Sequence, residues 1–500
     1  MTRRQLPQRE PQHPHKHPQT TVSEKAWEAT GVVIVANRLP VEQRPDGTLA
    51  RSPGGLASAL AAVASEGSHW IGWAGPDASQ ADLGDEYLHH VELSPREVTE
   101  YYHGFANSLL WPLFHGRLRQ PEMNRTWWRA YQTVNERYAE AVARIAPLNG
   151  LVWVHDYHLL LTPAMIRARR PDLRIGLFLH IPFPSVDLFA TLPWRGDLVR
   201  GMSNADLLGF QTEHDAANAA AAIRQYAGDL RPTSRVRDVG GAEIGTFPIS
   251  IDVEHWTKLG EDAAAAAERR RAELGVDFVF AGVDRLDYTK GIDQRLRAFR
   301  ELLDQGLLDS ASCCFVQVSV PSREEIFDYG EQRDEVEWLV ADINERHRGP
   351  DGGPSVRHIT SQLDEGELSE WYRAADCLVI TSYADGMNLV AKEFVAARRD
   401  LAASVVLSEF AGAAQAMPGA VIVNPFDIDA VKQAMLQARR MPVAERAARM
   451  TEMREAVGRT DVHTWAGSFL RRLSRSRLRS VGNAPVRMRT AAGVASQATP

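Results

Sequence analysis

The sequence has few cysteines, no long apolar run and only a small excess of negative charge. Its three cysteines among 500 residues form no Cys-x-x-Cys pair and are too few for a disulfide framework. No apolar run approaches the roughly 18 residues of a membrane-spanning helix. Lysine and arginine total 57 against 64 acidic residues, and this net charge of −7 gives no reason to expect binding to nucleic acid or to an anionic membrane. These absences exclude a disulfide-rich secreted scaffold and a membrane protein.

What is present is the composition of a soluble globular protein with two unusual ends. Hydrophobic residues make up 44% of the chain and charged residues 24%. Residues 1–30 begin with a stretch rich in Pro, Gln and His and have no apolar core, so we expect a disordered tail rather than a signal peptide, and a cytoplasmic protein. Residues 471–500 hold seven arginines and no acidic residue, and we expect residues 480–500 to be a disordered basic tail. A large cytosolic enzyme is the interpretation that remains.

Short apolar runs alternate with helical patterns between these tails. Runs that are apolar on both faces are typical of parallel strands in a sheet covered by helices on both sides. Ten runs are too many for one sheet, so the sequence predicts an α/β fold of two doubly wound parallel-sheet domains, residues 31–250 and 251–460. The expected strands are Gly31–Ala36, Leu151–His155, Arg174–His180, Ala205–Gln211, Ile244–Ile249, Phe278–Val283, Cys313–Val320, Asp376–Thr381, Ser404–Leu407 and Ala420–Val423.

A last helical pattern lies within residues 461–479 and carries one apolar stripe. Val462, Trp465, Phe469 and Leu473 stand three or four residues apart, which is the spacing of one helix face. This helix could complete the second domain or cross back onto the first, and the spacing leaves both positions open.

Polar residues follow several of the expected strands. They are Asn37, Arg38, His155, Asp156, His180, Gln211, Thr212, Asp284, Arg285, Asp385 and Glu409. Ligands of doubly wound sheets bind at the carboxyl ends of the strands. The sequence therefore predicts a polar cleft at these ends.

The segment 283–291, VDRLDYTKG, places two cations at such a strand end. Arg285 and Lys290 stand five residues apart, and Gly291 opens a helical pattern. Two cations near a helix N-terminus can neutralise a diphosphate, because the unpaired backbone N–H groups add positive potential. The alternative is a surface Arg–Asp ion pair followed by an ordinary helix start.

Two further segments combine glycine with a helix start. In residues 382–393, SYADGMNLVAKE, we expect a tight turn at Asp385 and a helix from Met387, with Glu393 placed to accept hydrogen bonds from ribose hydroxyls. The alternative for Glu393 is an exposed helix glutamate. Gly54 and Gly55 open the helical pattern 57–64 and allow close backbone approach to a ligand, although most Gly-Gly pairs are only turns.

Histidines and aromatic residues admit more than one interpretation. His155 and His158 flank a strand end, but no third ligand stands at a matching spacing, so we expect no metal. Asp156 and His180 either contact hydroxyls of a polar substrate or form a buried structural hydrogen bond. In the aromatic segment 101–115, Tyr102, Trp111 and His115 either line a sugar site or pack in the core. The P-loop, GxSxG and HExxH signatures are missing from the sequence.

These segments occur in one order, and together they resemble the trehalose-6-phosphate synthase family of retaining glycosyltransferases. The resemblance spans about residues 31–470 and rests on VANRLP, GGL, LLWPLFH, HDYHL, FLHIPFP, LLGFQT, VDRLDYTKG, VPSRE, DGMNLVAKE, LSEFAGAA and VNPFD. One departure is Ala36, where many members have serine. The resemblance implies the GT-B fold, in which two Rossmann-like domains face each other across a cleft.

The resemblance also implies a reaction. A nucleoside diphosphate glucose, UDP-glucose or possibly ADP- or GDP-glucose, would donate glucose to glucose 6-phosphate and yield α,α-trehalose 6-phosphate. No cofactor and no metal would be needed. A homotetramer is plausible, and a separate trehalose-6-phosphate phosphatase would consume the product, since no phosphatase domain follows in the sequence. Two rivals are a catalytically silent family member and a related transferase with another acceptor.

Site residues are implied in the same way, motif by motif. The acceptor glucose 6-phosphate would bind Arg38, Tyr102, Asp156 and Arg323, and anomer selectivity would come from Trp111 and His180. The donor would bind Gly54, Gly55, Arg285, Lys290, Leu363, Asp385, Leu389, Val390, Ala391, Lys392 and Glu393. The catalytic residues would be Arg285, Lys290, His180 and Asp385.

Overall fold

The computed structural model describes residues 31–43, 48–51, 59–60, 67–75, 78, 83, 85–117, 121–226, 241–323 and 325–476. Both expected tails and the Gly54-Gly55 pair lie outside these residues. Within them, no helix is both long and apolar enough to cross a membrane.

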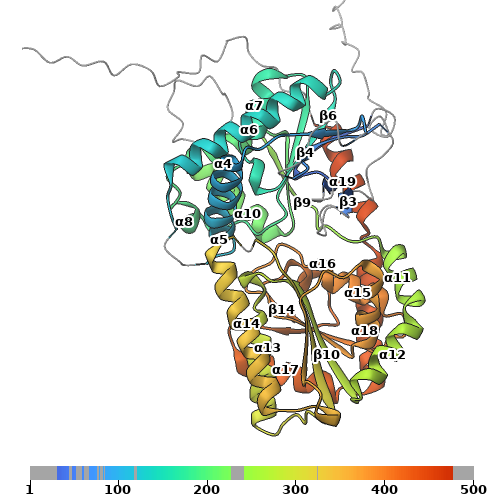
Figure 1. Ribbon diagram of the computed structural model, residues 1–500. Helices are drawn as coiled ribbons and strands as arrows, with labels where there is room; N and C mark the ends of the chain where they lie inside the picture. The colour runs from blue at the N-terminus through green and yellow to red at the C-terminus, as the bar shows by residue number, and fades with distance from the viewer. Residues whose placement is uncertain are drawn as a thin grey trace, which may run out of the picture.

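The first domain is built on a seven-stranded sheet in which all neighbours are parallel (Figure 1). Its strand order is β5-β4-β1-β6-β7-β8-β9. The strands are β1 (Val33–Arg38), β4 (His69–Trp73), β5 (Leu88–His90), β6 (Leu151–His155), β7 (Arg174–Phe178), β8 (Leu207–Phe210) and β9 (Glu243–Thr246). The helices include a 13-residue π-helix η1 (Val98–Leu110), α4 (Pro95–Glu97), α5 (Trp111–Phe114), α6 (Arg125–Ile145), α7 (Thr162–Arg169), α8 (Val186–Phe189), α9 (Arg195–Ser203) and α10 (Glu213–Tyr226).

The second domain repeats the plan with a six-stranded parallel sheet in the order β12-β11-β10-β13-β14-β15. The strands are β10 (Phe278–Arg285), β11 (Cys313–Val320), β12 (Val356–Ile359), β13 (Cys377–Ile380), β14 (Ser404–Ser408) and β15 (Val421–Val423). The helices are α11 (Val253–Asp262), α12 (Ala264–Leu274), α13 (Ile292–Asp304), α14 (Phe327–Arg346), α15 (Glu365–Ala374), α16 (Leu389–Ala397), α17 (Ile428–Arg440) and α18 (Val443–Gly458).

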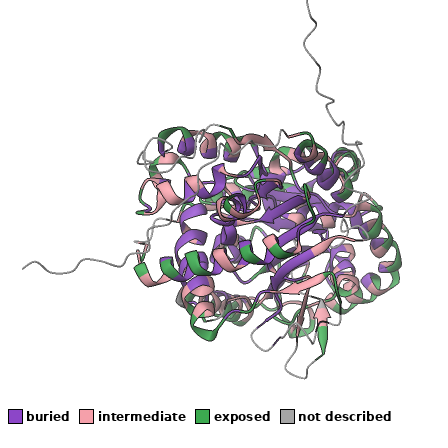
Figure 2. Ribbon diagram, turned by 90° about the horizontal axis from the view of Figure 1, so that it is seen from above, coloured by how far each residue is buried: buried purple, intermediate pink, exposed green. Residues whose placement is uncertain are grey.

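This architecture confirms the predicted fold of two doubly wound parallel sheets. Strands such as β6 and β14 are buried along their whole length, because helices cover both faces of each sheet. Figure 2 shows these purple strands inside a layer of helices whose outer faces are green. All ten expected strands are present in the structure.

Five strands were not predicted. The edge strands β5 and β12 are short and rich in His and Arg, since one side of an edge strand has no neighbouring strand to bury it. Central β4 was also missed, because it has one β-branched residue and a glycine. The other two, β2 (Val41–Gln43) and β3 (Leu49–Arg51), form a small antiparallel pair.

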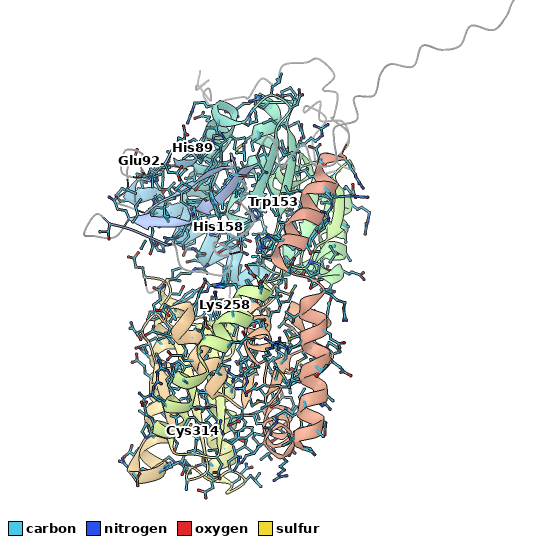
Figure 3. All side chains as sticks on the ribbon, turned by 90° about the vertical axis from the view of Figure 1, so that its right-hand side faces the viewer. His89, Glu92, Trp153, His158, Lys258 and Cys314 are labelled. Atoms are coloured by element: carbon cyan, nitrogen blue, oxygen red, sulfur yellow. The ribbon has the colours of Figure 1, made fainter. Side chains whose placement is uncertain are left out.

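The last described helix, α19 (Val462–Ser474), packs on the first domain, against β7 and β8. Its Phe469 ring stacks on Trp153 with centroids 4.9 Å apart. A Cβ on Gly176 or Gly209 would lie 2.6–2.7 Å from this ring, so glycine makes room for it in both strands. Figure 1 shows α18 in the lower domain and α19, in red, in the upper one, and Figure 3 shows Trp153 beside α19. The chain therefore crosses between the domains twice.

Candidate active site

One cavity of about 400 Å³ lies between the domains and receives side chains from both. Of the residues expected at the site, twelve line it: Arg38, Tyr102, Trp111, Asp156, His180, Arg285, Lys290, Arg323, Asp385, Leu389, Val390 and Glu393. Leu363, Ala391 and Lys392 do not line it. Leu363 packs at the edge of the core and the Lys392 ammonium donates to the Ile249 carbonyl. The cavity joins residues that are up to 357 positions apart in the sequence, from Ala36 to Glu393.

Arg38, the last residue of β1, stands at the carboxyl end of the first sheet. Its guanidinium lies 4.8 Å from the centre of the Trp73 ring and 5.5 Å from that of Tyr102, and it pairs with Glu42 at 3.3 Å. Burial opposes ionisation of the Tyr102 hydroxyl, but Arg38 and Arg323 outweigh this effect and lower the pKa of Tyr102 to about 8. This corner of the cavity therefore has a strongly positive potential.

Arg323 comes from the second domain and reaches across to the first. Its guanidinium donates to the Tyr329 hydroxyl at 2.7 Å and to the Tyr157 hydroxyl at 3.0 Å, and it lies 4.2 Å above the Trp111 ring. The backbone of Arg323 has φ of 54°, a left-handed conformation that is rare outside glycine and clusters at functional sites. These contacts hold the cation in one orientation before any ligand arrives.

Asp156 follows β6 and has a φ of 72°, the second unusual backbone conformation at the site. Its carboxylate accepts the His180 backbone N–H at 3.2 Å. Burial raises the pKa of Asp156 to about 6, although its hydrogen bonds to backbone N–H groups oppose this. Both alternatives that the sequence left open are thus partly met, because Asp156 and His180 are hydrogen-bonded to each other and also line the cavity.

Lys290 and Asp385 form the centre of the second domain's side of the cavity. The ammonium and the carboxylate lie 2.6 Å apart, and the Asn388 side chain donates to the same carboxylate at 3.1 Å. Burial favours the neutral acid, but Lys290 outweighs it, so the pKa of Asp385 is lowered. Arg285 lies nearby, 5.7 Å from the Trp111 ring. The surface Arg–Asp pair that was the alternative for this segment is not formed, since Asp284 pairs with buried Arg295.

The helix α16 points its N-terminus toward the cavity. It begins at Leu389, two residues later than predicted, because Asn388 adopts φ of 79° and its side chain caps the Ala391 N–H at 3.0 Å. The first N–H groups of a helix have no partner within the helix, so those of Leu389 and Val390 can meet an anion. Glu393 accepts a hydrogen bond from Tyr372 at 2.9 Å, and burial raises the pKa of Glu393 to about 7.

Close backbone contact joins the two walls at Gly386. A Cβ there would lie 2.0 Å from the His180 carbonyl oxygen, so a side chain at this position would push the domains apart. Gly291, before α13, is similarly constrained: its φ is 58° and a Cβ would lie 2.1 Å from the Thr381 oxygen. Both glycines stand in segments that the sequence had singled out.

Sequence reasoning assigned no role to several lining residues. Tyr157 holds Arg323, and Asn388 caps α16 and holds Asp385. Gln211, which the sequence marked only as a polar residue at a strand end, contacts His180. His158, whose ring is stacked on that of Tyr102, is buried and also lines the cavity. Asn388 could have been found from its position just before a helix, where asparagine is a preferred cap, whereas the other roles depend on contacts between distant segments.

Comparison with known proteins agrees with this geometry. The model of glycosyltransferase family 20 matches residues 30–475. A trehalose-6-phosphate synthase of Mycobacterium marinum is 44% identical over 470 residues, covering 89% of this chain and 94% of the relative.

Solved structures match over a similar length. The α,α-trehalose-phosphate synthase (UDP-forming) from Burkholderia xenovorans, in complex with glucose-6-phosphate, is 32% identical with a TM-score of 0.80 and covers 89% of this chain and 99% of its own. An E. coli structure bound with UDP-2-fluoro glucose is 32% identical with a TM-score of 0.78, at the same two coverages. The expected GT-B fold is thereby confirmed.

Proposed function

Because the chain belongs to glycosyltransferase family 20, the family of the trehalose-6-phosphate synthases, we propose that it transfers glucose from a nucleoside diphosphate glucose to glucose 6-phosphate. The products would be α,α-trehalose 6-phosphate and the nucleoside diphosphate. The observation that carries this proposal is a single cavity that holds two pairs of cations, which we call its two corners, with the Trp111 ring in contact with one arginine of each. Arg38 and Arg323 flank Tyr102 in one, and Arg285 and Lys290 stand near the N-terminus of α16 in the other.

The two corners suit the two phosphate groups of the substrates. Arg38 and Arg323 would bind the phosphate of glucose 6-phosphate, with Tyr102 and Asp156 on the acceptor. Guanidinium groups bind phosphate oxygens by charge-assisted hydrogen bonds. The stacking of Arg323 on Trp111 fixes the plane of its guanidinium group. Trp111 and His180 would shape the space around the acceptor's anomeric carbon, so that one anomer fits.

The donor would lie along the second domain. Arg285 and Lys290 would hold its diphosphate, Asp385 would hold the transferred glucose, and the backbone of residues 389–393 would bind the nucleotide, with Glu393 on the ribose. Departure of the diphosphate builds negative charge on its oxygens, and preoriented cations stabilise that charge as it develops. Leu363 and the Gly54-Gly55 pair are proposed donor contacts on the resemblance alone.

Retention of configuration fits a front-face reaction at this site. The acceptor hydroxyl would attack on the face from which the diphosphate leaves, and a departing phosphate oxygen would take the hydroxyl proton. Asp385 is a weak candidate for a covalent nucleophile, because Lys290 and Asn388 stabilise the negative charge of its carboxylate. The domains that close around both substrates would keep water away from the bond that breaks.

A donor panel tests the proposal. The full chain is incubated with glucose 6-phosphate and UDP-, ADP- or GDP-glucose, and nucleotide release and disaccharide phosphate are followed together. UDP-glucose is the expected donor, because relatives at 32% identity are described as UDP-forming or bound with UDP-2-fluoro glucose. Nucleotide release that does not depend on glucose 6-phosphate would contradict the proposal, since it would mean donor hydrolysis.

Assembly and cellular context follow as further parts of the proposal. We expect a cytoplasmic homotetramer, which light scattering of the full chain can measure. The product is a phosphate ester, so a separate phosphatase would release free trehalose from it.

A further inference from the structure

A series of hydrogen bonds runs from α16, the helix proposed to bind the nucleotide, to His180 through the segment that joins the domains. The Lys392 ammonium on α16 donates to the Ile249 carbonyl at 2.6 Å. The Ile249 N–H donates to the Gln211 side-chain oxygen at 2.9 Å, and the Gln211 nitrogen lies 3.4 Å from Nδ1 of His180. Gln211, Ile249 and Lys392 are all buried.

The backbone groups of Ile249 fix the direction of the hydrogen bonds in this series. A backbone N–H can only donate, so the Ile249 N–H requires the Gln211 oxygen to face it. The Gln211 nitrogen must then face His180, where it donates to Nδ1. An Nδ1 that accepts carries no proton, so the proton of a neutral His180 is on Nε2.

The same logic continues to a second histidine. Nε2 of His180 lies 3.0 Å from Nδ1 of His155, so His180 donates and His155 accepts. The His155 proton is then on Nε2, an atom that has no partner among the described residues. Burial lowers the pKa of both imidazoles, to about 3 for His180, which agrees with two neutral rings.

We propose that Gln211, oriented by the Ile249 peptide, is a positioning residue that holds His180 as the neutral Nε2–H tautomer. His180 then orients the sugar but takes no part in proton transfer. The inference rests on the proposed function, because a His180 outside proton transfer leaves the departing phosphate to take the proton of the acceptor hydroxyl. The Lys392 contact adds a tie from the nucleotide helix to the same peptide, so donor helix and His180 are held as one unit.

The surroundings of His180 support a group that does not titrate. The ionisable residues hydrogen-bonded to it are His155 and Asp156 at the end of β6, and Asp156 contacts its backbone N–H. From α19 the Trp465 ring meets His180 edge-on at 6.0 Å, and β7 presents Phe178 at 4.6 Å. The charged pair of Lys290 and Asp385 lines the same cavity from the second domain.

The test reads the tautomer directly. Nitrogen NMR of the full chain labelled with ¹⁵N-histidine, with signals assigned by their loss in His180→Asn and His155→Asn, is expected to show both rings neutral and protonated on Nε2 from pH 6 to pH 8. A His180 that carries its proton on Nδ1, or that titrates in this range, overturns the proposal. This readout needs no turnover, so a chain inactive with every donor would defeat the proposed function and leave the tautomer result standing.

Gln211→Glu tests the positioning role by an isosteric change. The carboxylate can still accept from the Ile249 N–H but can no longer donate to His180. His180 is expected to gain a proton on Nδ1 and become a cation at pH 7, and kcat is expected to acquire an ionisation that the parent lacks. Gln225→Glu, the same change at an exposed position of α10, serves as the control and is expected to leave both readouts unchanged. A Gln211→Glu chain with the parent's nitrogen shifts and pH profile would overturn the role of Gln211.

Discussion

The two walls of the cavity differ in how their polar groups are satisfied. On the wall from the second domain, several charged groups have partners in place: Lys290 with Asp385, Asp385 also with Asn388, and Glu393 with Tyr372. On the wall from the first domain, some buried polar atoms that line the cavity have no partner among the described residues. These atoms are the Trp111 indole nitrogen, Nε2 of His155 and both ring nitrogens of His158.

This difference is informative because burying an unpaired polar group costs free energy. A ligand's hydroxyl that pairs with such a group in a cavity gains binding free energy, because the group had no partner before. Groups that are already paired and oriented suit a wall that must stabilise charge during reaction without rearranging. The first wall is therefore suited to selecting a polyhydroxyl substrate, and the second to stabilising a charged leaving group.

The largest expected effect is on the second wall. Lys290→Met is expected to lower kcat by about two to three orders of magnitude, because a preoriented charge at a developing anion contributes about 3–4 kcal/mol. The KM for glucose 6-phosphate is expected to change little. Lys432→Met, a lysine paired with Glu301 at 2.9 Å on α17, is the matched control. Near-normal turnover of Lys290→Met would contradict the charge-stabilising role.

Lys290→Met is also expected to change how the stability of the protein depends on pH. The folded-state pKa of Asp385 is lowered by Lys290, so its stabilising contribution is present above the unfolded pKa of about 4 and is lost as the pH falls below it. Without Lys290, burial raises this pKa, and the chain should lose stability as the pH rises above 4. Urea unfolding at pH 5 and pH 8 measures this, and adding Asp385→Asn should abolish the difference without restoring turnover.

Arg323→Ala is expected to raise the KM for glucose 6-phosphate by about one to two orders of magnitude, which corresponds to the loss of a charged hydrogen bond of about 1.5–3 kcal/mol. The KM for the donor should change far less, because Arg323 is bound by Tyr157 and Tyr329 in the corner assigned to the acceptor. Arg346→Ala on α14 is the control, an arginine half-exposed to solvent. Equal changes in both constants would refute the acceptor assignment.

A smaller effect concerns pH and Tyr102. Its pKa of about 8 reflects the cations around it, so above pH 8 a tyrosinate occupies the corner proposed for the acceptor phosphate. A bound phosphate dianion disfavours this second negative charge. The KM for glucose 6-phosphate is therefore expected to rise by up to about tenfold for each pH unit above 8, and to stay flat in Tyr102→Phe. The donor KM in the same pH series is the internal control, and a flat parent profile would contradict the assignment.

The smallest expected effect is on stability. His158→Phe removes two unpaired ring nitrogens from the first wall and keeps the stacking partner of Tyr102, so the free energy of unfolding should stay within about 1 kcal/mol of the parent or rise. Tyr157→Phe, by contrast, breaks hydrogen bonds to Asn107 and Arg323 and should destabilise the chain. Thermal unfolding of both variants makes the comparison, and a strongly destabilised His158→Phe would show that this nitrogen pair is satisfied in the free protein.

The strand pattern and the motifs were enough to predict a large part of this molecule. Apolar runs alternating with helices specify two parallel sheets, because only covered sheets can bury such strands on both faces. Polar residues at strand ends marked nine lining residues of the cavity for the same topological reason, and the family motifs marked the others. The nine are Asn37, Arg38, His155, Asp156, His180, Gln211, Asp284, Arg285 and Asp385. The short edge strands β5 and β12 escaped prediction, since strands with one free edge need few apolar residues.

The sequence by itself thus determined the fold class, which follows from local patterns of burial, and its family motifs determined the chemical types at the site. Tertiary structure alone decided which partners these groups have. Arg323 finds Tyr157 in the other domain, Ile249 orients Gln211, and α19 returns to the first sheet to place Phe469 over two glycines. Such contacts join residues far apart in the chain, and their donor and acceptor directions depend on positions that no local pattern specifies.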